Sequence, residues 1–383
     1  MACPYVFVLD DAEEAGYFYH DLTQILGEQE VFYFPSSFRR AAKFGQRDAA
    51  NEILRTEVIS RLSAGHRPLF VVTYPEAVME KVVSRQKLDE QTLRLHAGER
   101  VDITFVEETL RAFGFRRVDY VYEPGQFAVR GSILDVFSFS SEWPYRVDFF
   151  GDEVDSIRTF EVQTQLSRDK QEEIVIVPEL AGYVQGKVPF TDFLPPETVL
   201  VMKDLFFLRD VADRVYADGF SAQALMDEQA RTEMEEAERH EKLRADLMLV
   251  DGSALMKGML DFRRVEVGNK PSATPQATVR FHLTAQPIFH KNFELVTRTF
   301  HEYLEKGYTL YILADSAKQT DRLASIFTEQ ASGIDFTPVN RTLHAGFADD
   351  DLKACFFTDH QIFDRFHKYN LRSDKARSGK VAL

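Results

Sequence analysis

The stretch PYRVDFFGDEVDSIRTF, residues 144–160, predicts a β-hairpin and governs how the surrounding chain is interpreted. Its two strands meet at Gly151-Asp152, a two-residue turn with glycine first, which is typical of type II′ hairpins. Side chains alternate between the faces of a strand, so one face collects an apolar set, Tyr145, Val147 and Phe149. The opposite face collects Arg146, Asp148 and Phe150. A large aromatic, Phe150, therefore stands on the charged face of the predicted sheet.

The return strand of the hairpin indicates which face is the core. We expect it to set Val154 opposite Phe149 and Ser156 opposite Val147. The face with Tyr145, Val147 and Phe149 is then the predicted core, and the position of Phe150 needs a separate explanation.

The bulk composition describes a globular chain of several modules. With 383 residues the chain exceeds one ordinary domain, and about two to four modules are expected. Apolar residues make up 44% and charged residues 28%, a balance typical of folded proteins. The net charge of −15 restricts any basic, duplex-binding surface to a local patch.

The cysteines and the apolar runs bear on location. Cys3 and Cys355 stand near opposite ends of the chain, so neither a disulfide framework nor a zinc-binding spacing is expected, which fits a reducing cytoplasm. The sequence shows no secretory signal and no apolar run of membrane-spanning length, so we expect no membrane association.

Short apolar runs alternate with amphipathic helical patterns at both ends of the chain. The expected strands of the first part are 5–10, 31–35 and 68–73, and the expected helices are 12–26, 49–62 and 76–83. The alternation resumes at 198–219 and again from about residue 286, where a helix, the strand YTLYILADS (308–316), a second helix and further short strands follow. This pattern predicts parallel α/β sheets.

The middle of the chain has a different period. Residues 116–179 alternate with period two between Gly and Pro turns, which predicts an antiparallel β module. Thr104, with Glu107 three residues later, is expected to open a helix ahead of it. The charged stretch 227–247 is expected to be a solvated helix, and the polar tail RSDKARSGK (372–380) a linker.

These patterns predict an α/β fold in which a parallel-sheet lobe is interrupted by a β-rich α+β insert and followed by a small α/β module. The expected boundaries are 1–91 and 186–285 for the two parts of the lobe, 92–185 for the insert, 286–367 for the small module and 368–383 for a linker.

Motifs for catalysis are missing from the sequence. The phosphate-loop pattern GxxxxGK[ST] is absent, and VGNKPS (267–272) imitates it with a single glycine and with Pro271 after the lysine. There is no acidic box for magnesium, no Cys/His pair with zinc spacing and no GxSxG elbow, and the histidines are scattered. We therefore expect a binding module with no catalytic, cofactor or metal site.

The stretch GQFAVRGSILDVFSFSSEWPYRVDFFGDEVDSIRTFEVQTQ (125–165) resembles the second module of the bacterial transcription-repair coupling factors (Mfd) and of their relative, the excision-repair helicase UvrB. The shared signature runs from Arg-Gly through an aliphatic pair, Asp and Phe to Tyr-Arg-x-[Asp/Glu]-x-Phe-Gly-Asp-Glu. VFYFPSSF (31–38) and LFVVTYPEAVMEKVV (69–83) look like the first α/β lobe of that family. The stretch from QPIFHKNFELV (286–296) onward is similar to a small module of the coupling factors, which favours them over UvrB.

Two departures qualify the resemblance. UvrB has a phosphate loop and a long aromatic hairpin that probes damaged DNA, and this sequence has neither. The family's translocase motor and RNA-polymerase-binding domain are also absent. The resemblance thus implies a degenerate phosphate-loop-type, UvrB-like lobe and a fragment without ATP-dependent activity of its own.

The resemblance also implies a partner and a site. In the family, the β module recruits the damage sensor UvrA by mimicking UvrB, and the matching motifs carry the contact residues over to Arg130, Arg146 and Phe150. The carboxy-terminal part of the full-length family protein is expected to mask the same surface, and RNA polymerase and DNA are bound through the missing domains. An aromatic flanked by arginines is typical of an interface hot spot.

Simpler explanations for these residues remain open at this point. Arg146 could pair with Asp148 or Asp155 as a surface ion pair, Arg130 could be a solvated strand end, and Phe150 could pack on the helix 104–114. Two other functions also stay open. One is a nucleotide-dependent DNA-remodelling helicase fragment of the UvrB type, and the other is weak DNA binding through the basic loop 36–47.

Overall fold

The computed structural model describes residues 3–37, 49–65, 68–180, 186–226, 249–268, 270–330 and 333–365. The predicted charged helix 227–247, the tail 368–383 and most of the basic loop 36–47 lie outside these ranges. The chain forms two compact units. The first is built from the described parts of Met1–Ala12 and Phe32–Ser272, and the second from those of Glu13–Val31 and Ala273–Leu371.

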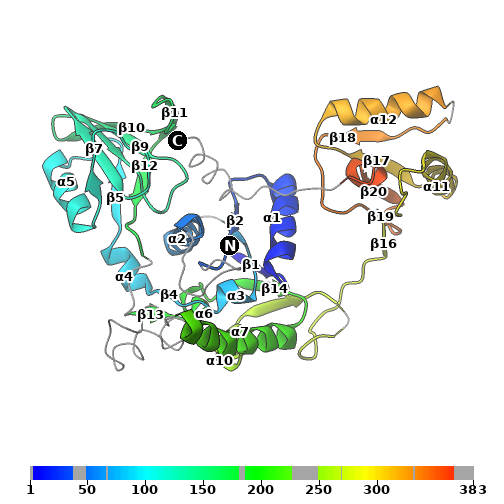
Figure 1. The fold of residues 1–383 in the computed structure, drawn as a ribbon, viewed down its shortest axis with the longest axis horizontal. Coiled ribbons are helices and arrows are strands. Elements are labelled where there is room, and N and C mark those ends of the chain that lie inside the picture. Colours follow the sequence, from blue (N-terminus) through cyan, green and yellow to red (C-terminus); the bar gives the residue numbers. More distant parts are fainter. Residues whose placement is uncertain are drawn as a thin grey trace. The chain divides into compact units, whose positions relative to one another are not determined.

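A five-stranded parallel sheet forms the centre of the first unit, in the order β15-β14-β1-β3-β2; its strands β1, β2 and β14 are labelled in Figure 1. Its strands are β1 (Tyr5–Val8), β2 (Val31–Tyr33), β3 (Phe70–Thr73), β14 (Val199–Met202) and β15 (Arg263–Glu266). Tyr5 pairs with Phe70 on one side and with Val199 on the other. Since β3 and β14 flank β1 but are distant in sequence, the chain leaves this sheet and returns to it. The interrupted parallel sheet predicted from the sequence is confirmed.

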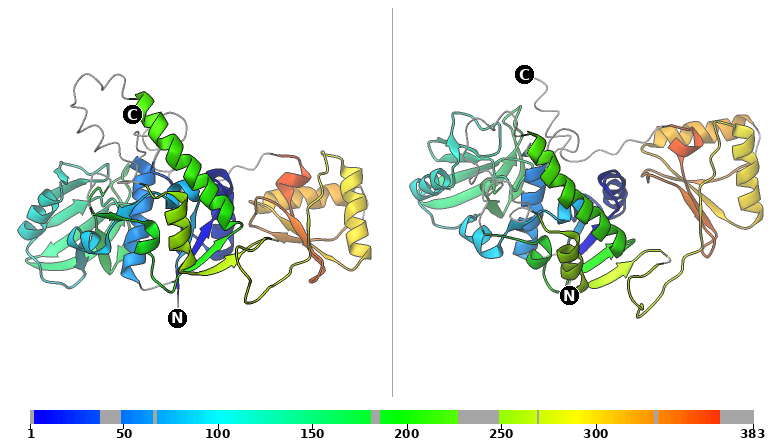
Figure 2. Two further views of the ribbon diagram at one scale, coloured as in Figure 1. Left: turned by 90° about the horizontal axis from the view of Figure 1, so that it is seen from below. Right: turned by 60° about the horizontal axis from the view of Figure 1, so that its bottom comes forward.

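Helices and one short strand pair accompany this sheet in the first unit. They are α2 (Ala49–Ala64), α3 (Pro75–Val78), α4 (Arg85–Glu90), α6 (Phe190–Phe193), α7 (Leu205–Met226), α10 (Gly252–Leu260) and the pair β4 (Val82–Val83) with β13 (Lys187–Val188). The helix expected at 76–83 is thus wrong beyond Val78, because its second half pairs as a strand. Helix α10 lies beside α7 (Figure 2), and a side chain at Gly252 would meet the Arg209 carbonyl at 2.3 Å, so only glycine allows this approach.

The insert between β3 and β14 forms its own six-stranded sheet, in the order β11-β10-β9-β8-β7-β6. Its strands are β6 (Arg116–Arg117), β7 (Gln126–Arg130), β8 (Ile133–Val136), β9 (Tyr145–Phe150), β10 (Glu153–Phe160) and β11 (Ser167–Gln171). A separate pair, β5 (Leu93–His96) and β12 (Glu173–Ile176), and the helix α5 (Ile103–Ala112) complete it. Helix α5 is capped by Asp102, whose carboxylate accepts a hydrogen bond from the Thr104 backbone N–H at 2.7 Å, so the predicted start at Thr104 is wrong.

One face of the insert sheet packs against α5 and the β5–β12 pair. The buried side chains of this core include Leu95, Val106, Leu110, Phe127, Leu134, Val147, Phe149, Val154 and Ile157. The predicted core face of the hairpin is therefore confirmed.

The register of the hairpin differs from the expected one after its first pair. Val154 lies opposite Phe149 as predicted, but Ser156 pairs with Asp148, and Ile157 takes the place opposite Val147. Asp155 is the extra residue of a β-bulge between these pairs. The bulge turns Ile157 rather than Ser156 into the core, because burying the isoleucine is favourable and burying the hydroxyl is not.

The second unit contains a mixed five-stranded sheet, in the order β16-β19-β20-β17-β18. Its elements are β16 (Leu283–Ala285), α11 (Phe293–Glu305), β17 (Thr309–Leu313), α12 (Ala317–Glu329), β18 (Thr337–Val339), β19 (Phe347–Asp349), β20 (Ala354–Thr358) and α13 (Asp359–Ile362). Phe289, Phe300 and Phe357 are fully buried in its core. The helix α1 (Ala12–Leu26) belongs to this unit from Glu13 on, and its Tyr17 stacks on His344 with ring centroids 3.6 Å apart. Among the described helices, none combines the length and apolar character that crossing a membrane requires.

Candidate partner-binding surface

The sheet face opposite the insert core carries the residues singled out by the sequence. We call it the polar face and define it by Arg130, Asp135, Arg146, Asp148, Phe150 and Arg158. Strand pairing aligns these residues in rows, because Asp135 of β8 lies opposite Arg146 of β9, which lies opposite Arg158 of β10. Cross-strand neighbours of this kind have their Cβ atoms about 5 Å apart, so charges in one row interact directly.

Asp135 is the centre of the row and is completely buried. Its carboxylate accepts hydrogen bonds from Arg146 Nε at 2.7 Å and from Arg146 Nη2 at 2.9 Å, a bidentate arrangement. Arg130 Nη2 donates to the same carboxylate from the other side. One buried anion therefore fixes two arginine side chains that come from different strands.

Arg146 is held on every side and is mostly covered. Its side chain is 16% exposed, its guanidinium lies 4.6 Å from the centre of the Phe160 ring, and Nη1 donates to the Gln165 carbonyl at 3.1 Å. The hydrogen bond to Asp135 raises the pKa of Arg146 above its ordinary value. The pairing with Asp148 or Asp155 considered from the sequence is wrong, because the ion-pair partner of Arg146 is Asp135 on the neighbouring strand.

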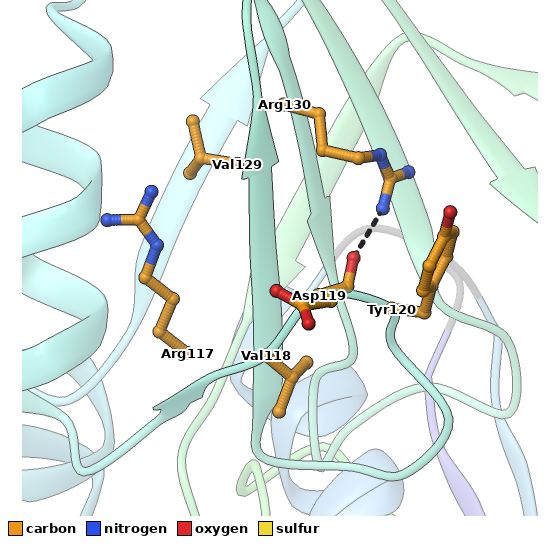
Figure 3. A pocket seen from close by; sticks show the side chains of 6 residues that line it. All are labelled: Arg117, Val118, Asp119, Tyr120, Val129 and Arg130. Carbon is orange, nitrogen blue, oxygen red and sulfur yellow. Dashed lines mark hydrogen bonds between the residues drawn. The ribbon is translucent and has the colours of Figure 1, made fainter.

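Arg130 is more accessible and borders a pocket. Its side chain is 35% exposed, Nη1 donates to the Asp119 carbonyl at 2.8 Å, and the guanidinium lies 5.1 Å from the centre of the Tyr120 ring. Figure 3 shows this guanidinium reaching to the loop that carries Asp119 and Tyr120. The pocket has a volume of about 540 Å³ and is lined by Arg117, Val118, Asp119, Tyr120, Val129 and Arg130. Arg130 is therefore not a solvated strand end, because the Asp135 carboxylate, the Asp119 carbonyl and the Tyr120 ring hold it.

Phe150 differs from both arginines because it is largely exposed and no side chain in the described part of the chain is seen to hold it. The ring is 82% exposed at the end of β9, next to Gly151, whose φ of 63° makes the tight turn possible. Helix α5 lies on the core side of the sheet, so the alternative in which Phe150 packs on that helix is wrong. Between Arg146 and Phe150, Asp148 pairs with Arg158 and accepts a hydrogen bond from Ser156 Oγ at 3.2 Å.

The structure thus places the three predicted residues on one face but not in one exposed patch. Arg130 and Arg146 meet at Asp135, whereas Phe150 lies four residues beyond Arg146, roughly 13 Å along the strand. Sequence reasoning missed Asp135 as the residue that joins the two arginines. The available signal was an aspartate in SILDVF (132–137), where strand alternation puts it on the face opposite Leu134 and Val136.

The α/β lobe offers no comparable site in its described part. VGNKPS (267–272) follows β15, and no helix starts in the described residues between Lys270 and β16, so the helix N-terminus that binds phosphate in true phosphate loops is absent there. Glu80 accepts hydrogen bonds from Ser36 and Ser37, which follow β2, and lies 3.6 Å from Arg55. The described residues also contain no group of three or more His, Cys, Asp and Glu side chains able to hold a metal ion.

Comparisons with known proteins match the segment of the chain that carries the polar face. Residues 93–181 match the family model of the UvrB interaction domain. The transcription-repair-coupling factor of Haemophilus influenzae is 36% identical over 124 residues, which are 32% of this chain and 11% of that protein. That of Escherichia coli is 35% identical with the same coverage. That of Staphylococcus aureus (strain bovine RF122) is 21% identical over 420 residues, which cover 94% of this chain and 36% of that protein. The chain is therefore homologous to the N-terminal region of transcription-repair-coupling factors and spans about a third of their length.

Proposed function

We propose that this chain is a non-catalytic, UvrB-mimicking region of a transcription-repair coupling factor that recruits UvrA in the bacterial cytoplasm. The observation that carries the proposal is the exposed Phe150, which lies on the same sheet face as a fixed arginine pair within the segment that matches the UvrB interaction domain. An aromatic ring that is 82% exposed gains little for folding and much for binding, because a partner can bury it. The residues of this proposal are Arg130, Arg146 and Phe150: Phe150 and the partly exposed Arg130 contact UvrA, and Arg146 fixes the surface through Asp135.

The wider role follows the homology. UvrA would be delivered to an RNA polymerase stalled at a DNA lesion, while the motor, the polymerase contact and the DNA contact belong to parts of the full-length protein outside this chain. The carboxy-terminal part of the full-length protein would mask the same face, so that UvrA could bind only once the motor is engaged. The sequence lacks a phosphate loop, which favours this recruitment role over DNA remodelling driven by nucleotide bound to this chain.

The test is a binding titration of UvrA from the same source against the whole chain. We expect binding by the wild type and an affinity about 30-fold lower for Phe150→Ala, which corresponds to roughly 2 kcal/mol. Phe105→Ala is the matched control, since Phe105 is also an exposed aromatic, at 57%, but lies on α5 on the other side of the sheet. Failure of the wild type to bind UvrA would refute the proposal, and so would an equal loss in both variants.

A nucleotide titration separates this proposal from the helicase alternative. We expect neither ATP binding nor magnesium-dependent hydrolysis by this chain. An ATPase activity that disappears in Lys270→Ala, at the one sequence resembling a phosphate loop, would favour the alternative.

A further inference from the structure

The polar face continues past β10 onto a segment that strand periodicity does not indicate. Arg100 forms an isolated antiparallel bridge with Glu153, and Glu153 in turn pairs with Phe150 across the hairpin. The backbone N–H of Val101 donates to the Asp152 carbonyl at 2.8 Å, and that of Val154 donates to the Glu99 carbonyl at 2.8 Å. These two hydrogen bonds flank the Arg100–Glu153 pair, which is therefore a non-hydrogen-bonded antiparallel pair, the kind whose side chains lie closer together. The backbone of Arg100 is therefore fixed against the tip of the hairpin.

The side chain of Arg100 faces the same way as Phe150. Its neighbour Val101 packs against the core that holds Phe149, so alternation directs Arg100 to the opposite face. Phe150, Glu153 and Arg100 then form one row, with Phe150 and Arg100 two strand spacings apart, about 10 Å.

In the described part of the chain, Arg100 is an arginine near Phe150 that has no internal partner. It is exposed, and within the described ranges its guanidinium makes no hydrogen bond, ion pair or stacking contact. The other arginines of the polar face form internal ion pairs: Arg130 and Arg146 pair with Asp135, and Arg158 pairs with Asp148. A guanidinium without an internal ion pair can use all its N–H donors to bind a partner protein, and it breaks no internal hydrogen bond when it does so.

We propose that Arg100 is a partner-binding residue that works together with Phe150. It would engage a carboxylate at the rim of an apolar pocket that takes the Phe150 ring. The proposal rests on the proposed function, because it assigns a further contact within the same protein interface. The nearby acidic residues are Glu153 in the same row, Asp152 in the turn and Asp155 in the bulge, so the partner's carboxylate has to approach from the Arg100 side of the row.

The experiment measures UvrA affinity with the whole chain in four forms: wild type, Arg100→Glu, Arg100→Lys and the control Arg116→Glu. Arg116 is an exposed arginine on β6 and also lacks an ion-pair partner in the described ranges. It lies at the opposite edge of the same sheet, five strand spacings or roughly 24 Å away. Arg116→Glu therefore changes the net charge by the same amount as Arg100→Glu but leaves the row of Phe150, Glu153 and Arg100 unaltered.

We expect Arg100→Glu to weaken UvrA binding at least about tenfold, Arg100→Lys to weaken it less, and Arg116→Glu to change it less than about twofold. The loss should shrink as salt rises, because the contact is ionic. Equal effects of Arg100→Glu and Arg116→Glu would overturn the assignment. So would an unchanged affinity of Arg100→Glu alongside a Phe150→Ala variant that binds poorly, and in that case the proposed function stands. A wild-type chain that does not bind UvrA would instead refute the proposed function and this assignment with it.

Discussion

The two ends of the polar face are built from similar residues and are used differently. At one end, Arg130 and Arg146 converge on Asp135, a carboxylate with no exposed surface. At the other end, Phe150 is 82% exposed and Arg100 has no partner in the described part of the chain. The first end satisfies its charges internally, whereas the second leaves an aromatic ring and a cation available. Residues inherited from one binding motif can therefore divide into those that shape a surface and those that contact its partner.

This comparison predicts a gradient in stability. Side chains at the Asp135 end should matter most for folding, and their effects should fall as exposure rises toward the hairpin tip. The chain has a single tryptophan, Trp143, which lies just ahead of β9 with the Arg168 guanidinium 4.2 Å from its ring. Tryptophan fluorescence during urea unfolding therefore reports on the insert alone.

The largest effect is expected for Asp135→Asn. The change leaves two guanidinium groups without their shared anion and turns an amide N–H₂ toward their N–H donors. We expect the free energy of unfolding of the insert to fall by about 3 kcal/mol, near the lower end for a broken buried ion pair because Arg130 is partly solvated. Asp148→Asn is the control, since Asp148 pairs with a more exposed arginine and should cost about 1 kcal/mol or less. Similar urea midpoints for the two variants would contradict the special role of Asp135.

The next effect is expected for Arg146→Met, which keeps the apolar stem but removes the bidentate bond to Asp135 and the bond to Gln165. Asp135 would then keep Arg130 as its remaining charged partner. A loss of about 2 kcal/mol is expected in the same urea titration. UvrA binding should weaken as well, through misplacement of Arg130. If Arg146→Met unfolds like the wild type and only UvrA affinity drops, Arg146 contacts the partner directly and the division between the two ends is wrong.

A smaller effect is expected for Arg130→Met. Asp135 would retain the bidentate bond from Arg146, and the 35% exposed Arg130 gives up a contact that solvent already screens. We expect the free energy of unfolding to fall by about 1 kcal/mol. The measurement is again the urea midpoint, and a loss as large as that of Arg146→Met would show that the two arginines are equivalent.

The sequence predicted the fold of this region well because its strands carry a regular alternation. The hairpin turn, the core face and the interruption of the parallel sheet were all visible in local patterns. The bulge at Asp155 was not visible in these patterns. It forms because Ile157 rather than Ser156 enters the core, and that choice depends on the residues of the opposite strand.

The parts of the site that were missed depend on contacts between distant segments. Asp135 meets Arg146 because β8 and β9 pair in one particular register, and Arg100 reaches the row of Phe150 through a bridge to a hairpin about 50 residues later. Alternation within a single strand states which residues share a face. It does not state which residue of a neighbouring strand lies beside them. The sequence motif therefore predicted the polar face, whereas the contacts of its residues with Asp135 and Arg100 became visible only in the structure.

The smallest effect on stability is expected for Phe150→Ala, and it tests the comparison from its other end. An exposed ring has few packing contacts to lose, so the free energy of unfolding should change by less than about 0.5 kcal/mol. The adjacent Phe149→Ala is the internal control. That ring is 5% exposed and packs in the insert core, so its truncation should cost about 3–5 kcal/mol in the same titration. Two neighbouring phenylalanines of one strand would then differ mainly in which face they occupy. A large destabilisation by Phe150→Ala would mean that the hairpin tip is held by its aromatic ring, and that this end of the face serves folding in the way the Asp135 end does.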